Sequence, residues 1–492
     1  MRIAVIGAGF GGIAAAHLLR QAGFRDVVIF DKADGVGGVW RDNVYPGCAC
    51  DIPAPLYSFS FALNPDWSQR FPPQPEILRY LQRCVRDFGL ETRLGTEVTA
   101  ADWTGDAWRL TLNKGTTNNG TTDNGTTSNG TTSNGTTEMF DVLIPAMGQL
   151  SRPDIPKLAG AEDFEGPALH TARWDVNQDV KGKRIAVIGT GASAIQLVPA
   201  IAEEAAHVTV FQRTAPWTLP KPNRQYGAWR RALNRRVPAV MRAARAGTWL
   251  LTWVTGKAVT GNRPARLAVW ALSSGQRLVQ ARGLRTAVTP DYAMGCKRVL
   301  FTGDWFRTLR RPDVDLVTAD IERITEAGIR TTDGESRACD LIVYGTGFAA
   351  TEFLAPVRIT GRDGRALHDE WQNGAYAHLG IAVPGFPNMF MMYGPNTNTG
   401  NTSVVYFHEA QARYIVQAVR LLSAGRPVEV RAEVAAAFDA EMQRRLGASV
   451  WVGCDSWYRT DGGRVVTNWP GMAGEYAART ARLNEADYTT TH

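Results

Sequence analysis

Residues 3–12 read Ile3-Ala4-Val5-Ile6-Gly7-Ala8-Gly9-Phe10-Gly11-Gly12, and this run decides the fold. Its four leading apolar residues predict a buried parallel strand, and the apolar pattern of residues 13–21 predicts a helix. A second predicted strand, Val27–Phe30, ends at Asp31. In a βαβ dinucleotide-binding unit, glycines at the positions of Gly7, Gly9 and Gly12 allow, in that order, a tight turn, close approach of a pyrophosphate and helix packing. The acid accepts hydrogen bonds from a ribose 2′-hydroxyl. We therefore predict a dinucleotide site formed by Gly7, Gly9, Gly12 and Asp31.

The same pattern recurs in the middle of the chain. A predicted strand, Lys183–Ile188, leads into Gly189-Thr190-Gly191-Ala192-Ser193-Ala194, and Val208–Phe211 is the next predicted strand. Arg213 stands 24 residues after Gly189, the same offset that separates Asp31 from Gly7. A carboxylate at this offset would repel a 2′-phosphate, whereas an arginine followed by Thr214 can bind one. The first site therefore suits FAD or NAD and the second suits NADPH, which together predict electron transfer from NADPH to a flavin.

Composition excludes several classes of protein. The 492 residues are 44% hydrophobic and 21% charged, which is typical of a globular chain of two or three domains. No apolar run is long enough to cross a bilayer, and no signal peptide precedes the glycine motif, so we expect a soluble, cytoplasmic protein. Six cysteines in a chain of this length predict no disulfide framework. No cluster of Cys or His residues lies near Cys48 and Cys50, so we predict no metal site. No nucleic-acid partner is expected, and the oligomeric state stays open.

Charge is unevenly distributed along the chain. The formal net charge is +7, yet residues 221–290 contain 14 Lys and Arg and no Asp or Glu, so the remainder carries −7. Apolar residues recur there at helical spacing, namely Trp229, Leu233, Val237, Val240 and Met241. We predict an inserted basic helical region at about 220–290. A solvated basic face is the simpler interpretation, and weak contact with a membrane surface or an acidic partner is the alternative.

One segment does not fit any folded core. From Gly115 onward the chain repeats Gly-Thr-Thr-X-X five times, between two predicted strands at Trp108–Leu112 and Met139–Pro145. The repeat has no hydrophobic residue before Met139 and is too short to build its own core. We therefore predict a disordered insert at 115–137.

Four further motifs carry a resemblance to a known family. They are Gly37-Gly38-Val39-Trp40, the stretch from Tyr45 to Asp51, the run 164–174 reading Phe-Glu-Gly-Pro-Ala-Leu-His-Thr-Ala-Arg-Trp, and Cys454-Asp455-Ser456-Trp457-Tyr458. Together with the two glycine motifs they resemble the pattern of type I Baeyer–Villiger monooxygenases, class B flavoproteins that use FAD and NADPH. The resemblance covers nearly the whole chain and lapses in the insert and in parts of the basic helical region.

The resemblance implies a role for individual residues. FAD would be held by Gly7, Gly9, Phe10, Gly12, Asp31, Lys32, Val39, Trp40, Asp51, Tyr57 and Val98. NADPH would be held by Gly189, Thr190, Gly191, Ala192, Ser193, Arg213, Thr214 and Lys297, with Trp457 on a loop that closes over it. Arg298 matches the active-site arginine and Asp51 the carboxylate beside it, which makes them the catalytic pair. The linker fingerprint comprises Phe164, Gly166, His170 and Trp174.

The implied fold is α/β, with two Rossmann-like dinucleotide-binding domains and an inserted helical subdomain. The first part of the FAD-binding domain would span 1–155, the NADP-binding domain 156–340, and the second part of the FAD-binding domain with a mobile C-terminal loop 341–492. The pocket would lie between both domains and the helical region, whose Trp249, Leu250, Leu251 and Trp253 suggest a small apolar substrate. The alternative is that these four residues form the core between helices.

The implied activity is oxygen insertion beside a carbonyl, which converts a ketone to an ester or lactone with NADPH and O2. A fixed arginine suits this chemistry because it stabilises negative charge on oxygen in a water-excluded site. Two alternatives stay open. One is an N- or S-oxygenating flavin monooxygenase, although those relatives usually carry Tyr or Phe where this chain has Trp174. The other is an NADPH oxidase or reductase that inserts no oxygen.

Overall fold

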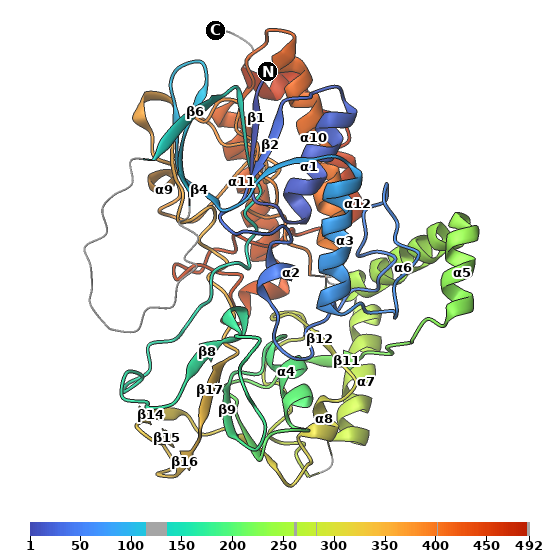
Figure 1. The fold of residues 1–492 in the computed structure, drawn as a ribbon, viewed down its shortest axis with the longest axis vertical. Coiled ribbons are helices and arrows are strands. Elements are labelled where there is room, and N and C mark those ends of the chain that lie inside the picture. Colours follow the sequence, from blue (N-terminus) through green and yellow to red (C-terminus); the bar gives the residue numbers. More distant parts are fainter. Residues whose placement is uncertain (115–134, 260–262, 282, 401, 490–492) are drawn as a thin grey trace.

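The computed structural model describes residues 1–114, 135–259, 263–281, 283–400 and 402–489 (Figure 1). The predicted α/β class is confirmed, because two separate parallel sheets each carry a glycine-rich turn after a central strand. The predicted insert at 115–137 lies outside the described residues except for its end. There Thr136 and Thr137 begin strand β6 (Thr136–Phe140), which pairs with β5 (Trp108–Lys114).

The first domain is built on a four-stranded parallel sheet in the order β3-β2-β1-β7. The strands are β1 (Ile3–Ile6), β2 (Val27–Phe30), β3 (Glu91–Arg93) and β7 (Val142–Pro145). Every side chain of β1, β2 and β7 is buried, as expected of a parallel sheet covered on both faces. Helix α1 (Phe10–Gln21) starts directly after Gly9, so the predicted strand-turn-helix unit is present.

The second domain is built on a five-stranded sheet in the order β13-β10-β9-β17-β8. These strands are β8 (Ala168–His170), β9 (Arg184–Ile188), β10 (His207–Phe211), β13 (Val314–Val317) and β17 (Leu341–Tyr344). Helix α4 (Ala194–Ile201) follows the second glycine turn. Strand β17 follows the predicted domain boundary at 340, yet it pairs with β9 and therefore lies in the second sheet.

Smaller sheets and helices complete both domains. A four-stranded side sheet has the order β18 (Arg358–Thr360), β4 (Thr96–Trp103), β5 and β6. A three-stranded sheet consists of β14 (Ile321–Thr325), β15 (Gly328–Thr331) and β16 (Ser336–Ala338). Two short pairs are β11 (Thr218–Pro220) with β12 (Leu300–Thr302) and β19 (Glu429–Val430) with β20 (Tyr488–Thr489). The shorter helices are α2 (Val39–Asp42), α8 (Trp305–Thr308), α9 (Leu367–Glu370) and α12 (Ala473–Arg479).

The first domain is discontinuous in sequence. Its long helices are α1 and α3 (Gln74–Asp87) from the N-terminal part, and α10 (Val404–Ser423) and α11 (Ala432–Gly447) from the C-terminal part. Helix α10 packs along α1, and one hydrophobic core contains residues from Ile3 to Tyr488 (Figure 1). The second domain is thus inserted between two halves of the first.

The basic region is helical, as predicted, and its described part contains three helices. They are α5 (Ala228–Arg236), α6 (Pro238–Val259) and α7 (Arg263–Gln280), which lie along one side of the molecule (Figure 1). None of the helices in the described part of the chain combines the length and hydropathy needed to cross a bilayer.

Candidate active site

A cavity of about 790 Å³ is lined by residues of both domains. The second domain contributes Gly189–Ser193, which follow β9, and Arg213 and Thr214, which follow β10. The carboxyl ends of adjacent parallel strands meet at one edge of a sheet, so these two segments share the cavity wall. Of the predicted site residues, the cavity lining also includes Val39, Trp40, Asp51, Tyr57, Lys297, Arg298 and Trp457.

Arg298 and Asp51 meet at the wall of this cavity. The arginine Nη2 lies 2.6 Å from Asp51 Oδ2, and its Nε donates to the same oxygen at 3.1 Å. The two residues are 247 positions apart and come from different domains, so the ion pair joins the domains. Both side chains keep part of their surface exposed, which leaves the guanidinium accessible from the cavity.

The electrostatics keep this pair ionised. The carboxylate of Asp51 raises the pKa of Arg298 far above its ordinary value, against the opposing effect of burial. Burial alone would raise the pKa of Asp51, but Arg298 and then Lys221 hold it below its ordinary value. Burial also raises the pKa of the neighbouring Tyr458 to about 12, so that phenol stays neutral. Arg298 is therefore a permanent cation facing the cavity.

Gln196 of α4 attaches the Asp51 loop to the second domain. Its Oε1 accepts from the Tyr45 hydroxyl at 3.1 Å and from the Ala49 backbone N–H at 3.2 Å, and its Nε2 donates to the Ala49 carbonyl at 3.0 Å. Gly47 has φ +80°, and a Cβ there would collide with the Gln196 carbonyl. Sequence reasoning missed Gln196, because an isolated glutamine in a helix carries no motif.

A second group of cations, Lys297 and Arg213, also lines the cavity. Lys297 Nζ is 3.4 Å from Thr214 Oγ1, and Thr190 Oγ1 donates to the Thr214 carbonyl at 3.0 Å. Burial and then the positive charge of Arg213 lower the pKa of Lys297. Two mutually repelling cations beside a hydroxyl form a suitable site for a dianionic phosphate, which would relieve their repulsion. The residues present therefore fit the 2′-phosphate of NADPH.

The first glycine motif provides an anion site at the start of α1. Gly9 is the N-cap of α1, no side chain caps this end and the first turn contains no acidic residue, so backbone N–H groups remain available. A Cβ at Gly12 would collide with the Gly7 carbonyl, which explains the need for glycine there. Asp31 is buried and accepts from the Ala8 N–H at 2.8 Å and the Ala33 N–H at 3.0 Å. This arrangement fits the pyrophosphate of FAD.

The remaining predicted FAD residues have different surroundings. Trp40 Nε1 donates to the Tyr57 hydroxyl at 3.0 Å, and both residues line the cavity. Val98 is buried in β4 within the hydrophobic core of the side sheet, and Lys32 is exposed. Among the described residues, the lining of this cavity includes none of the seven N-terminal positions Gly7, Gly9, Phe10, Gly12, Asp31, Lys32 and Val98.

The linker fingerprint packs against the second sheet rather than lining the cavity. His170 ends β8, is buried, and accepts from the Ala172 N–H at 3.1 Å through Nδ1. Burial lowers its pKa, so the ring is neutral. Trp174 is buried in the core of the second domain, and a Cβ at Gly166 would lie 2.7 Å from the Phe164 ring. The fingerprint residues therefore belong to the packing of the second domain.

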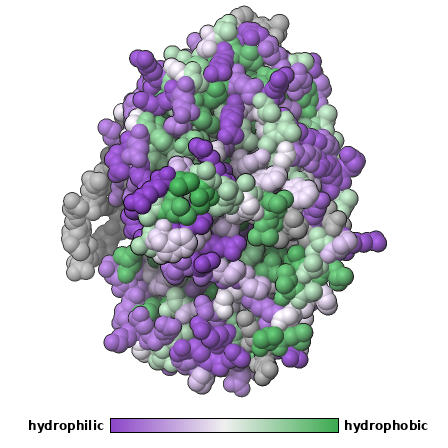
Figure 2. All heavy atoms as spheres, turned by 90° about the vertical axis from the view of Figure 1, so that its right-hand side faces the viewer, coloured by the Kyte–Doolittle hydropathy of each residue, from purple (hydrophilic) through white to green (hydrophobic). Residues whose placement is uncertain are grey.

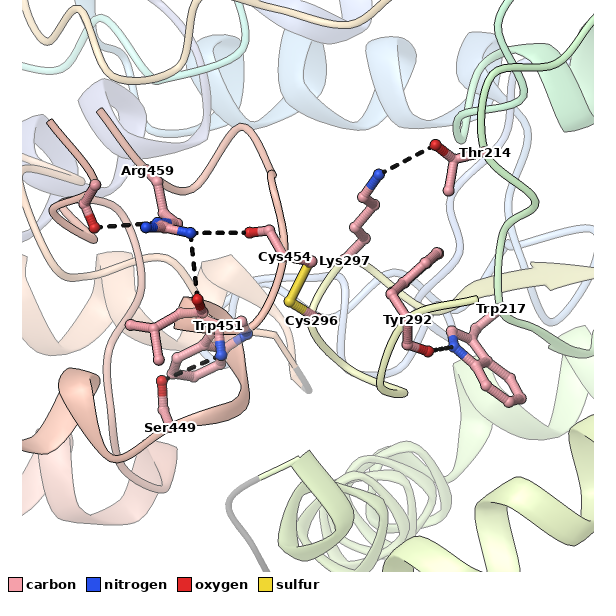
Figure 3. Close-up of a disulfide and its surroundings, with 11 residues drawn as sticks. Thr214, Trp217, Tyr292, Cys296, Lys297, Ser449, Trp451, Cys454 and Arg459 are labelled. Carbon is pink, nitrogen blue, oxygen red and sulfur yellow. Dashed lines mark hydrogen bonds between the residues drawn. A yellow bond between two sulfur atoms is a disulfide. The ribbon is translucent and has the colours of Figure 1, made fainter. Parts of the chain in front are cut away.

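A disulfide joins two segments of the cavity wall (Figure 3). Cys296, immediately before Lys297 and Arg298, is bonded to Cys454 of the C-terminal loop, 158 residues later. Arg459 binds the Cys454 carbonyl at 3.3 Å, and Trp457 of the same loop lines the cavity. The prediction that the cysteines form no disulfide framework therefore missed this bond. A pairing across 158 residues leaves no local spacing pattern in the sequence, which is why it was missed.

Breaking this bond should loosen the loop. We expect Cys296→Ser and Cys454→Ser each to raise the KM for NADPH by about threefold to tenfold, because a released loop loses conformational freedom when it binds cofactor. A reductant should produce the same change in the wild type and none in either variant. Cys339→Ser, at a buried free thiol in the second domain, serves as the control. Steady-state kinetics with and without dithiothreitol check this, and identical wild-type kinetics in both conditions would contradict it.

The C-terminal part supplies cavity residues that the sequence motifs did not identify. Tyr393 lies close enough to Arg298 to interact electrostatically, and its hydroxyl donates to Asn398 Oδ1 at 2.7 Å. Its backbone adopts φ +60°, a conformation that non-glycine residues rarely hold. Asn398 in turn donates to Asn468 Oδ1 at 2.8 Å. The turn residues Gly394, Pro395 and Asn396 are the one local signal that could have drawn attention to this segment.

Known proteins resemble the chain over nearly its whole length. A family model described as an NAD(P)-binding Rossmann-like domain matches residues 5–73. A Baeyer–Villiger monooxygenase of Pseudomonas aeruginosa is 39% identical over 100% of this chain and 91% of its own length. An oxidised steroid monooxygenase bound to NADP superimposes with a TM-score of 0.84 at 30% identity, covering 99% of this chain and 98% of its own. OTEMO in complex with FAD and NADP also has a TM-score of 0.84, at 26% identity and 98% and 97% coverage.

With this fold, an arginine-carboxylate pair between two dinucleotide-binding domains, and full-length relatives of this kind, the chain belongs to the Baeyer–Villiger monooxygenase family. It is an enzyme, a flavoprotein monooxygenase, so the predicted class and activity are confirmed.

Proposed function

We propose that the enzyme oxidises a small apolar ketone to an ester or lactone through a site centred on Arg298. The reaction consumes the ketone, O2, NADPH and a proton, and yields the ester, water and NADP⁺. When bound, FAD accepts electrons from NADPH and activates O2 for the insertion. The observation that carries the proposal is the contact of Arg298 with Asp51 at 2.6 Å in the cavity wall.

Arg298 would stabilise negative charge on oxygen at two stages. Its guanidinium keeps its proton at any working pH, so it can face both the reduced oxygen and the oxyanion that forms at the attacked carbonyl. Asp51 binds Nε and Nη2 of Arg298, which orients the guanidinium and leaves its other nitrogen for the cavity. Arg213, Thr214 and Lys297, which line the same cavity, would hold the 2′-phosphate of NADPH.

The lining of the cavity favours an apolar substrate. Trp40, Leu300, Val404 and Trp457 contribute apolar surface to the cavity that Arg298 and Asp51 also line. The residues of α6 that were expected to line the pocket are not in the described lining, and Leu250 is 56% exposed to solvent. Selectivity would therefore depend on Leu300 and Val404 rather than on α6.

A panel of ketones of varied ring size and chain length, turned over under labelled O2, tests the proposal. We expect ester or lactone that carries one labelled oxygen, formed in step with NADPH consumption. Oxygenation confined to amine or sulfide substrates would contradict the ketone assignment. NADPH consumption that yields hydrogen peroxide alone would contradict oxygen insertion itself.

We also propose that the enzyme works in the cytoplasm. Four of its six cysteines are free, buried thiols, which suits a reducing compartment, and the Cys296–Cys454 bond is the exception. Fractionation of the native host cells, followed by detection of the protein with an antibody, tests this location.

A further inference from the structure

Helices α5, α6 and α7 expose a set of large apolar side chains. The described ones are Trp229, Leu250, Leu251, Leu267, Trp270, Leu272, Leu278 and Val279, together with Val237 between α5 and α6, with exposed fractions from 41% to 70%. Figure 2 looks onto this side of the molecule and shows hydrophobic patches between hydrophilic ones. Exposed apolar patches rimmed by polar residues mark interaction surfaces.

Helix α7 is turned with its polar side inward. Its buried residues include Ser273, Gln276 and Arg277, which are 0%, 6% and 7% exposed. Gln276 accepts from Thr218 Oγ1 at 3.1 Å and donates to the Thr302 carbonyl at 3.0 Å. A helix that only had to cover this domain would bury its apolar residues instead.

The outward side of α7 is correspondingly apolar. From Leu267 to Val279 its exposed residues are Leu, Ala, Trp and Val, and none of the described exposed ones carries a charge. Leu267, Trp270 and Leu278 recur at spacings of three and eight and share one face of the helix. This apolar face is therefore available to a partner.

Basic residues lie on the same helical region as the apolar face. Residues 221–290 contain 14 Lys and Arg and no acidic residue, and Arg263 and Arg266 are exposed at the start of α7. Arg235, Arg236 and Arg242 are exposed on α5 and α6. Some of these cations are used inside the protein, as Arg235 pairs with Asp66 at 2.6 Å. The partner must therefore be apolar where it meets α7 and negatively charged around that contact.

We propose that α5–α7 dock the enzyme onto the surface of an anionic lipid bilayer. Leu and Trp would enter the interface between headgroups and acyl chains, while arginines contact lipid phosphates, the arrangement of helices that lie on a membrane. A bilayer offers apolar and anionic surface together over the whole length of α7, whereas a protein partner would need an acidic rim around a matching apolar groove. The basic charge together with the length of the apolar face thus favours the lipid.

Sedimentation with vesicles tests the docking on the full-length holoenzyme. The probes are vesicles of pure phosphatidylcholine and vesicles containing about one third phosphatidylglycerol. We expect binding to the anionic vesicles that is at least tenfold stronger than to the neutral ones and that weakens as salt is raised.

Two variants separate the apolar from the charged contribution. The triple change Leu267→Ser, Trp270→Ser and Leu278→Ser should reduce binding to anionic vesicles at least tenfold, and so should Arg263→Glu with Arg266→Glu. Matched controls are Val176→Ser, an exposed apolar residue elsewhere, and Arg20→Glu with Arg25→Glu, exposed arginines of the first domain. These controls should bind as the wild type does.

All these variants should turn over a water-soluble ketone at the wild-type rate, because none of the changed residues lines the cavity. Equal binding to neutral and anionic vesicles, or unchanged binding in both α7 variants, would overturn the proposal. The proposal would also be overturned if, without vesicles, the wild type is a dimer and the triple variant is a monomer. In that case the partner of the apolar face is a second copy of this chain.

Discussion

Arg298→Ala is expected to abolish ester formation while the protein still folds and binds FAD. The guanidinium is the permanent cation that faces the cavity, and the FAD contacts proposed for the first domain lie on other segments. Loss of an electrostatic donor of this kind costs about a hundredfold to a thousandfold in turnover. NADPH should still be oxidised, with the electrons released as hydrogen peroxide. Product analysis by gas chromatography, together with peroxide and NADPH assays, measures all three quantities.

Companion variants show whether the loss reflects the charge or the pair. Arg298→Lys should recover part of the activity, since it keeps the charge but cannot bind Asp51 through two nitrogens. Asp51→Ala should be milder than Arg298→Ala, and the double variant should be far from additive because the residues act together. Arg445→Ala is the matched control, since Arg445 forms a half-buried pair with Glu475 at 2.6 Å away from the cavity. Arg445→Ala should lower the Tm and leave turnover unchanged. If Arg298→Ala forms ester at the wild-type rate, the active site lies elsewhere.

Arg213→Ala is expected to remove most of the preference for NADPH. A charge-assisted hydrogen bond is worth about 1.5–3 kcal/mol, so the KM for NADPH should rise roughly tenfold to a hundredfold. The KM for NADH, which lacks the 2′-phosphate, should change little. Steady-state kinetics with both cofactors measure the ratio.

Arg184→Ala is the control for this experiment. Arg184 lies in the same domain and forms an exposed ion pair with Asp340 at 2.5 Å, outside the cavity lining. It should leave both KM values unchanged. A wild type that uses NADPH and NADH equally would contradict the role of the 24-residue offset between Gly189 and Arg213.

The repeated glycine motifs made the double-domain fold predictable. Each motif combines a short apolar strand, a turn that needs glycine and a helix, so local residues determine local structure. Strand β2 has the predicted bounds, Val27–Phe30, and β9 and β10 differ from prediction by one residue at their starts. The prediction that Arg298 and Asp51 lie together depended instead on the resemblance, because no local sequence pattern relates residues that are 247 positions apart.

Features that depend on the packing of distant segments were not predictable. The Cys296–Cys454 bond and the Gln196 contacts with the Asp51 loop arise only when the domains are assembled. The inverted orientation of α7 is a similar case. Its sequence contains both an apolar and a polar face, and only its contacts with Thr218 and Thr302 show which one faces inward.

The discontinuous first domain has a consequence for the order of events during synthesis. All strands of the second sheet lie within residues 168–344, so that domain can close its core once Tyr344 has left the ribosome. Strand β1 and helix α1 emerge first, but they must wait for α10 and for a core that extends to Tyr488. Because domains fold as units, we expect the nascent chain to have a folded second domain and an incomplete first domain until translation is nearly over. FAD capture is therefore a late event in the making of this enzyme.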